Sequence, residues 1–173
     1  MAYLVRKIAR SKWPDKICPV EELPGDTIAD IRTSNNELSV WLIDSTDGLD
    51  SAALALSASS KTDKIEKLQL VWIPLDEIEK KQLNVSDENE GDTIIPDLAD
   101  MHRDLNNLTY GALGKIASII QNELLEKNNY KLFSRGDVKK ALVAAYKDRR
   151  IAEERCSPKL LEEIRKAVSA SSN

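Results

Sequence analysis

The segment LQLVWIP, residues Leu68–Pro74, has a single polar residue and is the natural starting point for predicting the fold. An apolar run without alternation is typical of a strand that is covered on both faces of a sheet. Leu38–Ile43 is a second strand candidate, and apolar residues at helical spacing from Leu49 to Leu56 predict a short helix between the two strands. A strand–helix–strand order predicts a right-handed crossover within one sheet.

Two more strands are expected before this unit. Tyr3–Ile8 has β-branched and aromatic residues that favour a strand. Thr27–Arg32 is separated from Leu38–Ile43 by TSNN, residues 33–36, whose asparagines tolerate the positive φ of a tight hairpin. We therefore expect a small mixed sheet of about four strands with one crossover helix, capped at its N-terminus by Asp47.

The second half of the chain has helical patterns instead. Apolar spacing and start signals predict about four helices, over residues 96–107, 110–127, 134–149 and 157–169. Pro96, a capping box formed by Ser134 and Asp137, and the pair Ser157-Pro158 mark three of the starts. The fold class expected from the whole pattern is α+β.

An acidic segment separates the two halves. Residues 84–93, NVSDENEGDT, carry four acidic residues and no large apolar side chain except Val85. Such a composition is typical of a linker. We accordingly expect an α/β sheet module at 1–83, an acidic linker at 84–95 and a helical module at 96–173.

Composition narrows the class of protein. The chain has 173 residues, of which 42% are hydrophobic and 31% charged, as in a soluble globular protein. Its two cysteines, Cys18 and Cys156, cannot build a disulfide framework or a four-ligand zinc site of Cys/His type. The sequence contains neither an apolar run near 18 residues nor a signal peptide pattern, so we expect a cytoplasmic protein without membrane contact.

Candidate catalytic residues are few. The one histidine, His102, lies between Asp100 and Asp104 and could serve as a general base or metal ligand. On the expected helix, however, Asp100 would face elsewhere, and neither cysteine has a second histidine as its base. The segment 111–115, GALGK, lacks the spacing of a phosphate-binding loop. We expect no catalytic, cofactor-binding or metal-binding residues, and a small enzyme centred on His102 stays an alternative.

Charge is unevenly distributed along the chain. Residues 1–20 have a net charge of +4, residues 21–104 have 7 basic against 20 acidic residues, and residues 105–173 have 13 basic against 8 acidic residues. Seven cations gather in residues 131–150 among aromatic side chains, which favours binding of an acidic protein surface or of nucleic acid. Packing of the basic end on the chain's own acidic middle is an equally weighted alternative. The predicted partner-binding residues are Lys131, Arg135, Lys139, Lys140, Lys147, Arg149 and Arg150.

The beginning of the chain resembles a group of small bacterial proteins. Tyr3–Ile8, Lys12-Trp13-Pro14 and Arg32–Trp41 are similar to the start of proteins that accompany large ATPases or nucleases in mobile-element and defence operons. In size and layout the chain resembles the small accessory subunits of Lamassu-type anti-phage and anti-plasmid complexes and the middle components of three-component ABC-type systems. The resemblance covers roughly the first 45 residues and implies no functional residue.

These features together predict a non-catalytic accessory or regulatory subunit of a bacterial multi-protein complex, one that acts in defence against phage or plasmids. Its expected partner is a larger protein, such as an ATPase or nuclease subunit. A nucleic-acid-binding regulator that uses the basic residues 131–150 is the second hypothesis.

Overall fold

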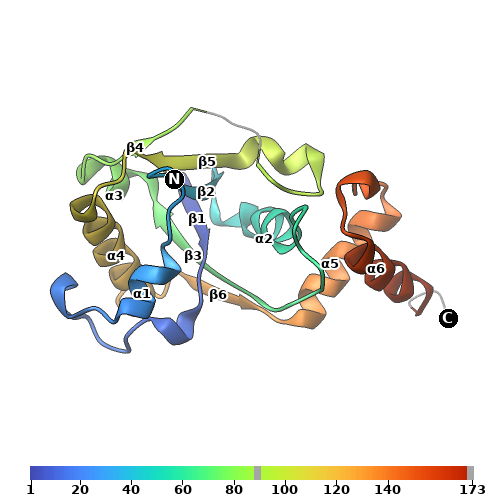
Figure 1. Cartoon of the computed structure of the whole chain (residues 1–173), viewed down its shortest axis with the longest axis horizontal. Coiled ribbons are helices and arrows are strands. Elements are labelled where there is room, and N and C mark those ends of the chain that lie inside the picture. The colour runs from blue at the N-terminus through green and yellow to red at the C-terminus, as the bar shows by residue number, and fades with distance from the viewer. Residues whose placement is uncertain (88–90, 171–173) are drawn as a thin grey trace.

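One antiparallel sheet forms the centre of the molecule. The computed structural model describes residues 1–87 and 91–170, and within these residues the sheet has six strands in the order β4-β5-β2-β1-β3-β6 (Figure 1). The strands are β1 (Tyr3–Lys7), β2 (Leu38–Ile43), β3 (Leu68–Pro74), β4 (Asn84–Val85), β5 (His102–Asn106) and β6 (Tyr130–Phe133).

A crossover that joins two parallel strands through a helix is present in this sheet, as predicted. β2 and β3 both pair antiparallel with β1, through Leu4↔Leu42 and Leu4↔Ile73, and are therefore parallel to each other. The helix that connects them, α2, spans Leu49–Ser57 as its apolar spacing indicated. β1 is thus a central strand, and its residues Leu4 and Val5 are both fully buried.

Helices cover both faces of the sheet. They are α1 (Gly25–Asp30), α2, α3 (Leu75–Lys80), α4 (Tyr110–Leu125), α5 (Arg135–Lys147) and α6 (Pro158–Ala170). One core joins Val5 and Leu70 to side chains of α2, α5 and α6, whereas the other joins Leu4 and Ile73 to α4. α5 and α6 lie together at one end of the molecule (Figure 1). Because neighbouring residues of a strand point to opposite faces, the apolar runs in β1 and β3 supply both cores.

The start signals predicted for α5 and α6 are confirmed, and α4 likewise begins at a side-chain cap. The Thr109 side chain accepts a hydrogen bond from the backbone N–H of Ala112 at the start of α4. Ser134 and Asp137 form the capping box of α5, with each side chain accepting a hydrogen bond from the other residue's backbone N–H. α6 begins at Pro158, where Ser157 accepts a hydrogen bond from a backbone N–H.

The predicted strand Thr27–Arg32 and its hairpin are wrong. Residues Gly25–Asp30 form helix α1, which follows Pro24, and the Thr27 hydroxyl donates a hydrogen bond to the carbonyl of Lys12. These long-range contacts override the local β preference of threonine and isoleucine. The asparagine turn exists, with positive φ at Asn35 and Asn36, but it closes only one bridge.

The predicted helix at 96–107 is also wrong. Pro96–Met101 forms a 3₁₀ helix, and the next residues form strand β5, which pairs with β2 on one side and β4 on the other. Two ladders of backbone hydrogen bonds stabilise the strand against the local helical pattern. The sheet accordingly has six strands rather than four among the described residues, and three α-helices rather than four follow residue 96 there. The expectation of a mixed sheet is also wrong, because all five pairs of neighbouring strands in the described residues are antiparallel.

Asp47 does not cap α2. It lies inside a short 3₁₀ helix, Thr46–Gly48, whose start is capped by the Ser45 side chain. α2 follows this 3₁₀ turn directly and has no side-chain cap, because the preceding Gly48 already has a helical conformation.

The predicted linker at 84–95 is partly structured. Its first residues form β4, its last residues Thr93, Ile94 and Ile95 are fully buried, and residues 88–90 lie outside the described part of the chain. The division into modules at 1–83 and 96–173 stays a prediction, although strands from both sides of the linker belong to one sheet. In the two described ranges, every helix is too short or too polar to cross a membrane.

Candidate functional site

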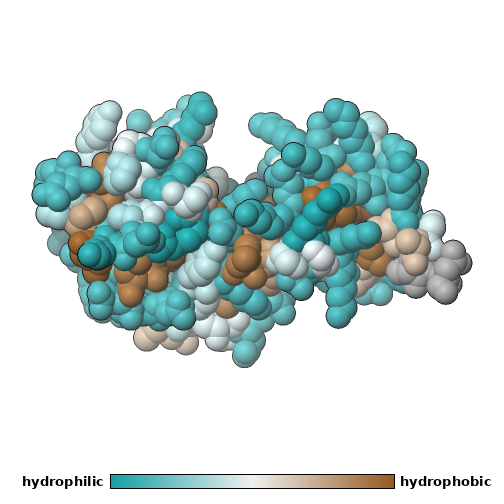
Figure 2. Space-filling view, turned by 90° about the horizontal axis from the view of Figure 1, so that it is seen from below, coloured by the Kyte–Doolittle hydropathy of each residue, from teal (hydrophilic) through white to brown (hydrophobic). Residues whose placement is uncertain are grey.

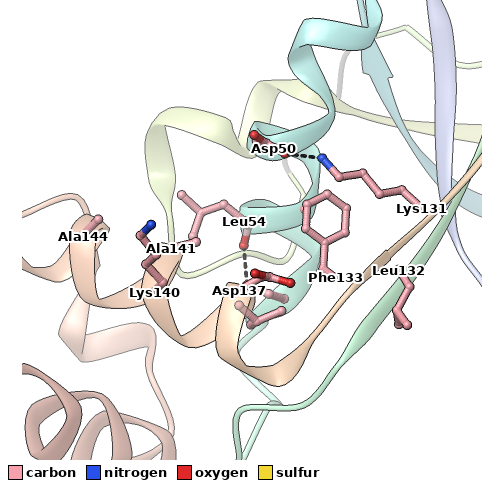
Figure 3. Close-up of a pocket in the computed structure, with 12 residues that line it drawn as sticks. Asp50, Leu54, Lys131, Leu132, Phe133, Asp137, Lys140, Ala141 and Ala144 are labelled. Atoms are coloured by element: carbon pink, nitrogen blue, oxygen red, sulfur yellow. Dashed lines mark hydrogen bonds and ion pairs between the residues drawn. The ribbon is translucent and has the colours of Figure 1, made fainter.

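A groove lies between α2, β6 and α5 (Figure 3). Its volume is about 450 Å³. Apolar side chains make up its walls, namely Ala53, Leu54, Phe133, Val138, Ala141 and Ala144. Charged side chains stand at its rim, namely Asp50, Lys131, Asp137 and Lys140. An apolar recess with a charged rim is suited to hold an apolar side chain of a ligand while the rim orients it.

Strand β6 forms one wall of this groove. Side chains alternate along the strand, so that Phe133 is buried in the groove whereas Leu132 points away from it (Figure 3) and is 50% exposed. The ammonium of Lys131 lies 4.4 Å from the centre of the Phe133 ring and 3.0 Å from Asp50 Oδ1. Lys131 thereby connects β6 to α2 across one end of the groove.

The α5 side of the groove contains the capping box. Hydrogen bonds from the side chain and backbone of Ser134 lower the pKa of Asp137 below its usual range. Asp137 is therefore ionised at neutral pH, and Lys140 lies one turn further along the same helix. The groove thus presents both signs of charge at its rim.

A second, more open hollow lies on the Leu132 side of β6. Its volume is about 630 Å³, and it is lined by Lys64, Ile65, Glu66, Lys67, Leu132, Ser134 and Arg135. Three of these residues are basic and one is acidic. Lys64 pairs with Glu66 at 2.8 Å, and Arg135 pairs with Glu163 at 2.6 Å. Lys67 has no ion pair among the residues that the structure describes, so the hollow keeps a positive balance.

An apolar patch is visible on this side of the molecule. In the view of Figure 2 it lies near the middle, in the region where Figure 1 places β6, and polar side chains surround it. Leu132 is the exposed large apolar side chain of β6.

The seven predicted partner-binding cations do not form one surface. Lys131 and Lys140 line the groove, and Arg135 lines the hollow. Lys139 lies exposed on α5, as does Lys147 at the helix end. The last two cations follow α5: Arg149, in a left-handed conformation with φ of 57°, and Arg150. Within residues 1–87 and 91–170, Lys139 and Lys140 are not in an ion pair.

Part of the basic end pairs with the acidic middle of the same chain. Lys131 pairs with Asp50, Arg150 with Asp97 at 2.6 Å, and Lys159 with Asp63 at 3.4 Å. These are surface pairs, each of which stabilises a protein by about 0–1 kcal/mol. The alternative in which the two charge blocks offset each other within one molecule is thus realised for Lys131, Arg150 and Lys159.

His102 lies on strand β5 rather than on a helix. Its ring meets the edge of Trp41 with 5.6 Å between centroids, and its Nε2 lies 3.7 Å from Asp104 Oδ1. Burial lowers the pKa of His102, although the charge of Asp104 opposes that effect. In the described ranges, three or more His, Cys, Asp or Glu side chains nowhere gather in a way that could hold a metal ion.

The cysteines lie apart from the groove and the hollow. Cys18 contacts the amide of Gln121, with Sγ 3.5 Å from Oε1. Cys156 is buried beside α6, and this burial raises the pKa of its thiol. A thiol with a raised pKa is a poor nucleophile at neutral pH.

Sequence patterns missed strand β6 and therefore both recesses beside it. Only the aromatic and apolar content of YKLF, residues 130–133, hinted at a strand.

Comparison with known proteins adds no function to this geometry: no protein-family model matches the chain, and no curated protein or solved structure is significantly similar to it.

Proposed function

We propose that this protein is a non-catalytic accessory or regulatory subunit that binds a larger protein partner through β6 and α5. The observation that carries the proposal is the apolar groove between α2, β6 and α5, with its rim of charged side chains. Protein interfaces combine an apolar centre with a polar border in the same way.

The nature of the partner is proposed from the start of the chain. Its first 45 residues resemble small subunits of bacterial operons that defend against phage or plasmids, which supports an ATPase or nuclease subunit as the partner. Cytoplasmic location belongs to the same proposal.

Nucleic acid is a weaker candidate ligand. Lys131, Arg135 and Arg150 are engaged by carboxylates of the same chain, which reduces the positive charge available to phosphates. The sequence pI near 5.2 is likewise low for a nucleic-acid-binding domain.

Charge reversal at Lys139 and Lys140 tests the proposal. The chain is expressed with its neighbouring genes, and the purified complex is analysed by native mass spectrometry at low and moderate salt. We expect Lys139→Glu with Lys140→Glu to weaken the complex without unfolding the chain, because both side chains are exposed. Lys16→Glu with Lys81→Glu, which makes the same charge change at exposed positions elsewhere, serves as the control.

The outcomes separate the hypotheses. Absence of any partner, or equal loss of the complex in both double variants, would contradict a binding surface at β6 and α5. The wild type could instead bind unrelated DNA or RNA sequences with an affinity that falls steeply with salt. If the Lys139→Glu/Lys140→Glu variant then has a shallower dependence of affinity on salt, the hypothesis of a nucleic-acid-binding regulator replaces this one.

A further inference from the structure

β6 is an edge strand whose outer side has no neighbouring strand in the described residues. We propose that this edge accepts an extended segment of the partner as a seventh strand, in which apolar side chains alternate with acidic ones. The inference rests on the proposed function, since it specifies how the same surface would bind. Addition of a strand to an open sheet edge is a recurrent mode of peptide recognition.

The alternation of hydrogen-bonded residues along β6 identifies the backbone groups that face away from β3. In an antiparallel pair, successive residues direct their N–H and C=O groups to alternate sides. The N–H of Trp72 on β3 donates to the carbonyl of Asn129 at 3.2 Å, and the register places Leu70 opposite Lys131. Lys131 is therefore bonded to β3.

The intervening residues of β6, Tyr130 and Leu132, consequently direct their backbone groups away from the sheet. No turn, loop or side-chain group within residues 1–87 and 91–170 bonds to the backbone of either residue. An added strand would satisfy both N–H groups and both carbonyls.

The two recesses beside the edge determine what the added strand must carry. On the Phe133 side lies the apolar groove, and on the Leu132 side lies the hollow with Lys64, Lys67 and Arg135. Leu132 borders both recesses, although its side chain is directed away from the groove (Figure 3). Because side chains of a strand alternate between faces, a segment on this edge would direct every second residue to the groove and the others to the cations.

Charge argues against a second copy of this chain as the occupant. Pairing of β6 with β6 would bring Lys131 and the cations of the hollow close to the same groups of the partner copy, and like charges facing each other across strands are destabilising. The opposite edge, β4, has only two residues and offers a shorter template. An acidic segment of another protein is therefore the occupant that fits the β6 edge.

A blocked synthetic peptide of alternating valine and glutamate is the probe. Its binding to the full chain is followed by the backbone amide resonances in NMR spectra and by hydrogen exchange. We expect a dissociation constant in the millimolar range or tighter, with the largest shifts and slowed exchange at the amides of Tyr130 and Leu132. Two peptides are the matched controls. One alternates valine and lysine, and the other has the valine and glutamate residues of the probe grouped into one run of valines and one run of glutamates. Both should bind about tenfold more weakly than the probe.

Two variants locate the contacts. Lys64→Glu with Lys67→Glu should weaken binding of the valine–glutamate peptide about tenfold and strengthen binding of the valine–lysine peptide. The Lys16→Glu/Lys81→Glu variant should bind both peptides as the wild type does. Leu132→Pro removes an outward N–H while the β3 pairing is kept, a substitution that edge strands tolerate, and should also weaken binding. The charge variants keep the test valid if the proline variant does not fold.

The proposal is overturned if the alternating peptide does not shift the β6 amides, or if the block peptide binds as well. Self-association that is slowed by the Leu132→Pro change would indicate a second copy as the occupant and would equally overturn it. If the peptide fails while the complex still depends on Lys139 and Lys140, the proposed function stands without the added strand.

Discussion

Asp30 is a single residue that organises the irregular segment after β1. One carboxylate oxygen accepts hydrogen bonds from the backbone N–H of Ala9 at 2.8 Å and from Trp13 Nε1 at 2.9 Å. The Asp30 side chain is only 11% exposed, and the Trp13 ring is part of the buried core. The carboxylate thus holds the tryptophan and the end of β1 in fixed positions.

Asp30→Ala should lower the free energy of unfolding by about 2–4 kcal/mol, because two largely buried donors lose their acceptor. Urea denaturation followed by tryptophan fluorescence measures the effect. Glu21→Ala, at an exposed position of the same segment, is the control and should change stability little. Equal stability of the Asp30 variant and the wild type would show that water replaces the carboxylate at no cost.

His102 is the residue that offers a pH test. Burial beside Trp41 lowers the pKa of His102 below the ordinary histidine value of 6.5. The unfolded chain therefore binds this proton at higher pH than the folded chain does. Its contribution to stability is complete above about pH 6.5 and is lost as the pH falls through the lower folded pKa.

NMR titration of the one histidine ring should give a pKa below 6.5, and Asp104→Asn should lower it further because the opposing charge is removed. Urea melts between pH 7.5 and 5 should show a smaller loss of stability for His102→Gln than for the wild type. A folded-state pKa above 6.5 would be incompatible with this account.

At the scale of elements, the end of the acidic segment packs on the sheet. A Cβ atom at Gly91 would lie 2.7 Å from the Cβ of His102 and 2.8 Å from the Trp41 ring. The Gly91 N–H also donates to the carbonyl of Ala99 at 3.2 Å, which joins this segment to the 3₁₀ helix before β5. Glycine is needed here for a close approach of chain to sheet.

Gly91→Ala should cost about 1–3 kcal/mol of stability, because the methyl group overpacks a site bounded by two side chains of the sheet. Thermal and urea denaturation measure this loss. Gly25→Ala is a suitable control, since its Cβ would meet no atom within 4 Å. If the two alanine variants were equally stable, the segment could shift away from Trp41 without cost.

At the scale of the whole molecule, the sheet joins the two halves of the chain. β5 pairs with β2, and β6 pairs with β3, so each half contributes strands that the other half needs. Ala152 also donates a backbone hydrogen bond to Ile94 at 2.9 Å. The halves share their cores as well as their sheet.

A chain that carries a specific protease site inserted after Asp87 tests this continuity. After cleavage we expect the two fragments to elute together in size-exclusion chromatography and to unfold in one transition. The reason is that three ladders of backbone hydrogen bonds, β2 to β5, β4 to β5 and β3 to β6, cross the cut. The uncut chain with the same insertion is the control. Separation of two folded fragments would instead support independent modules at 1–83 and 96–173.

Local sequence signals were sufficient for the parts of this fold that depend on neighbouring residues. Thr109, Ser134 and Ser157 mark helix starts because their side chains bond to backbone groups a few residues away. The buried strand Leu68–Pro74 is recognisable because both of its faces are covered and must be largely apolar.

Distant contacts decided the rest. β5 has the polar sequence HRDLN and β6 is YKLF, and their extended state depends on ladders to β2 and β3 in the other half of the chain. Backbone hydrogen bonds carry no side-chain signature, so composition did not reveal either strand. The groove and the open edge arise only when α2, β6 and α5 meet, which is why the sequence alone indicated basic residues but not the surface they border.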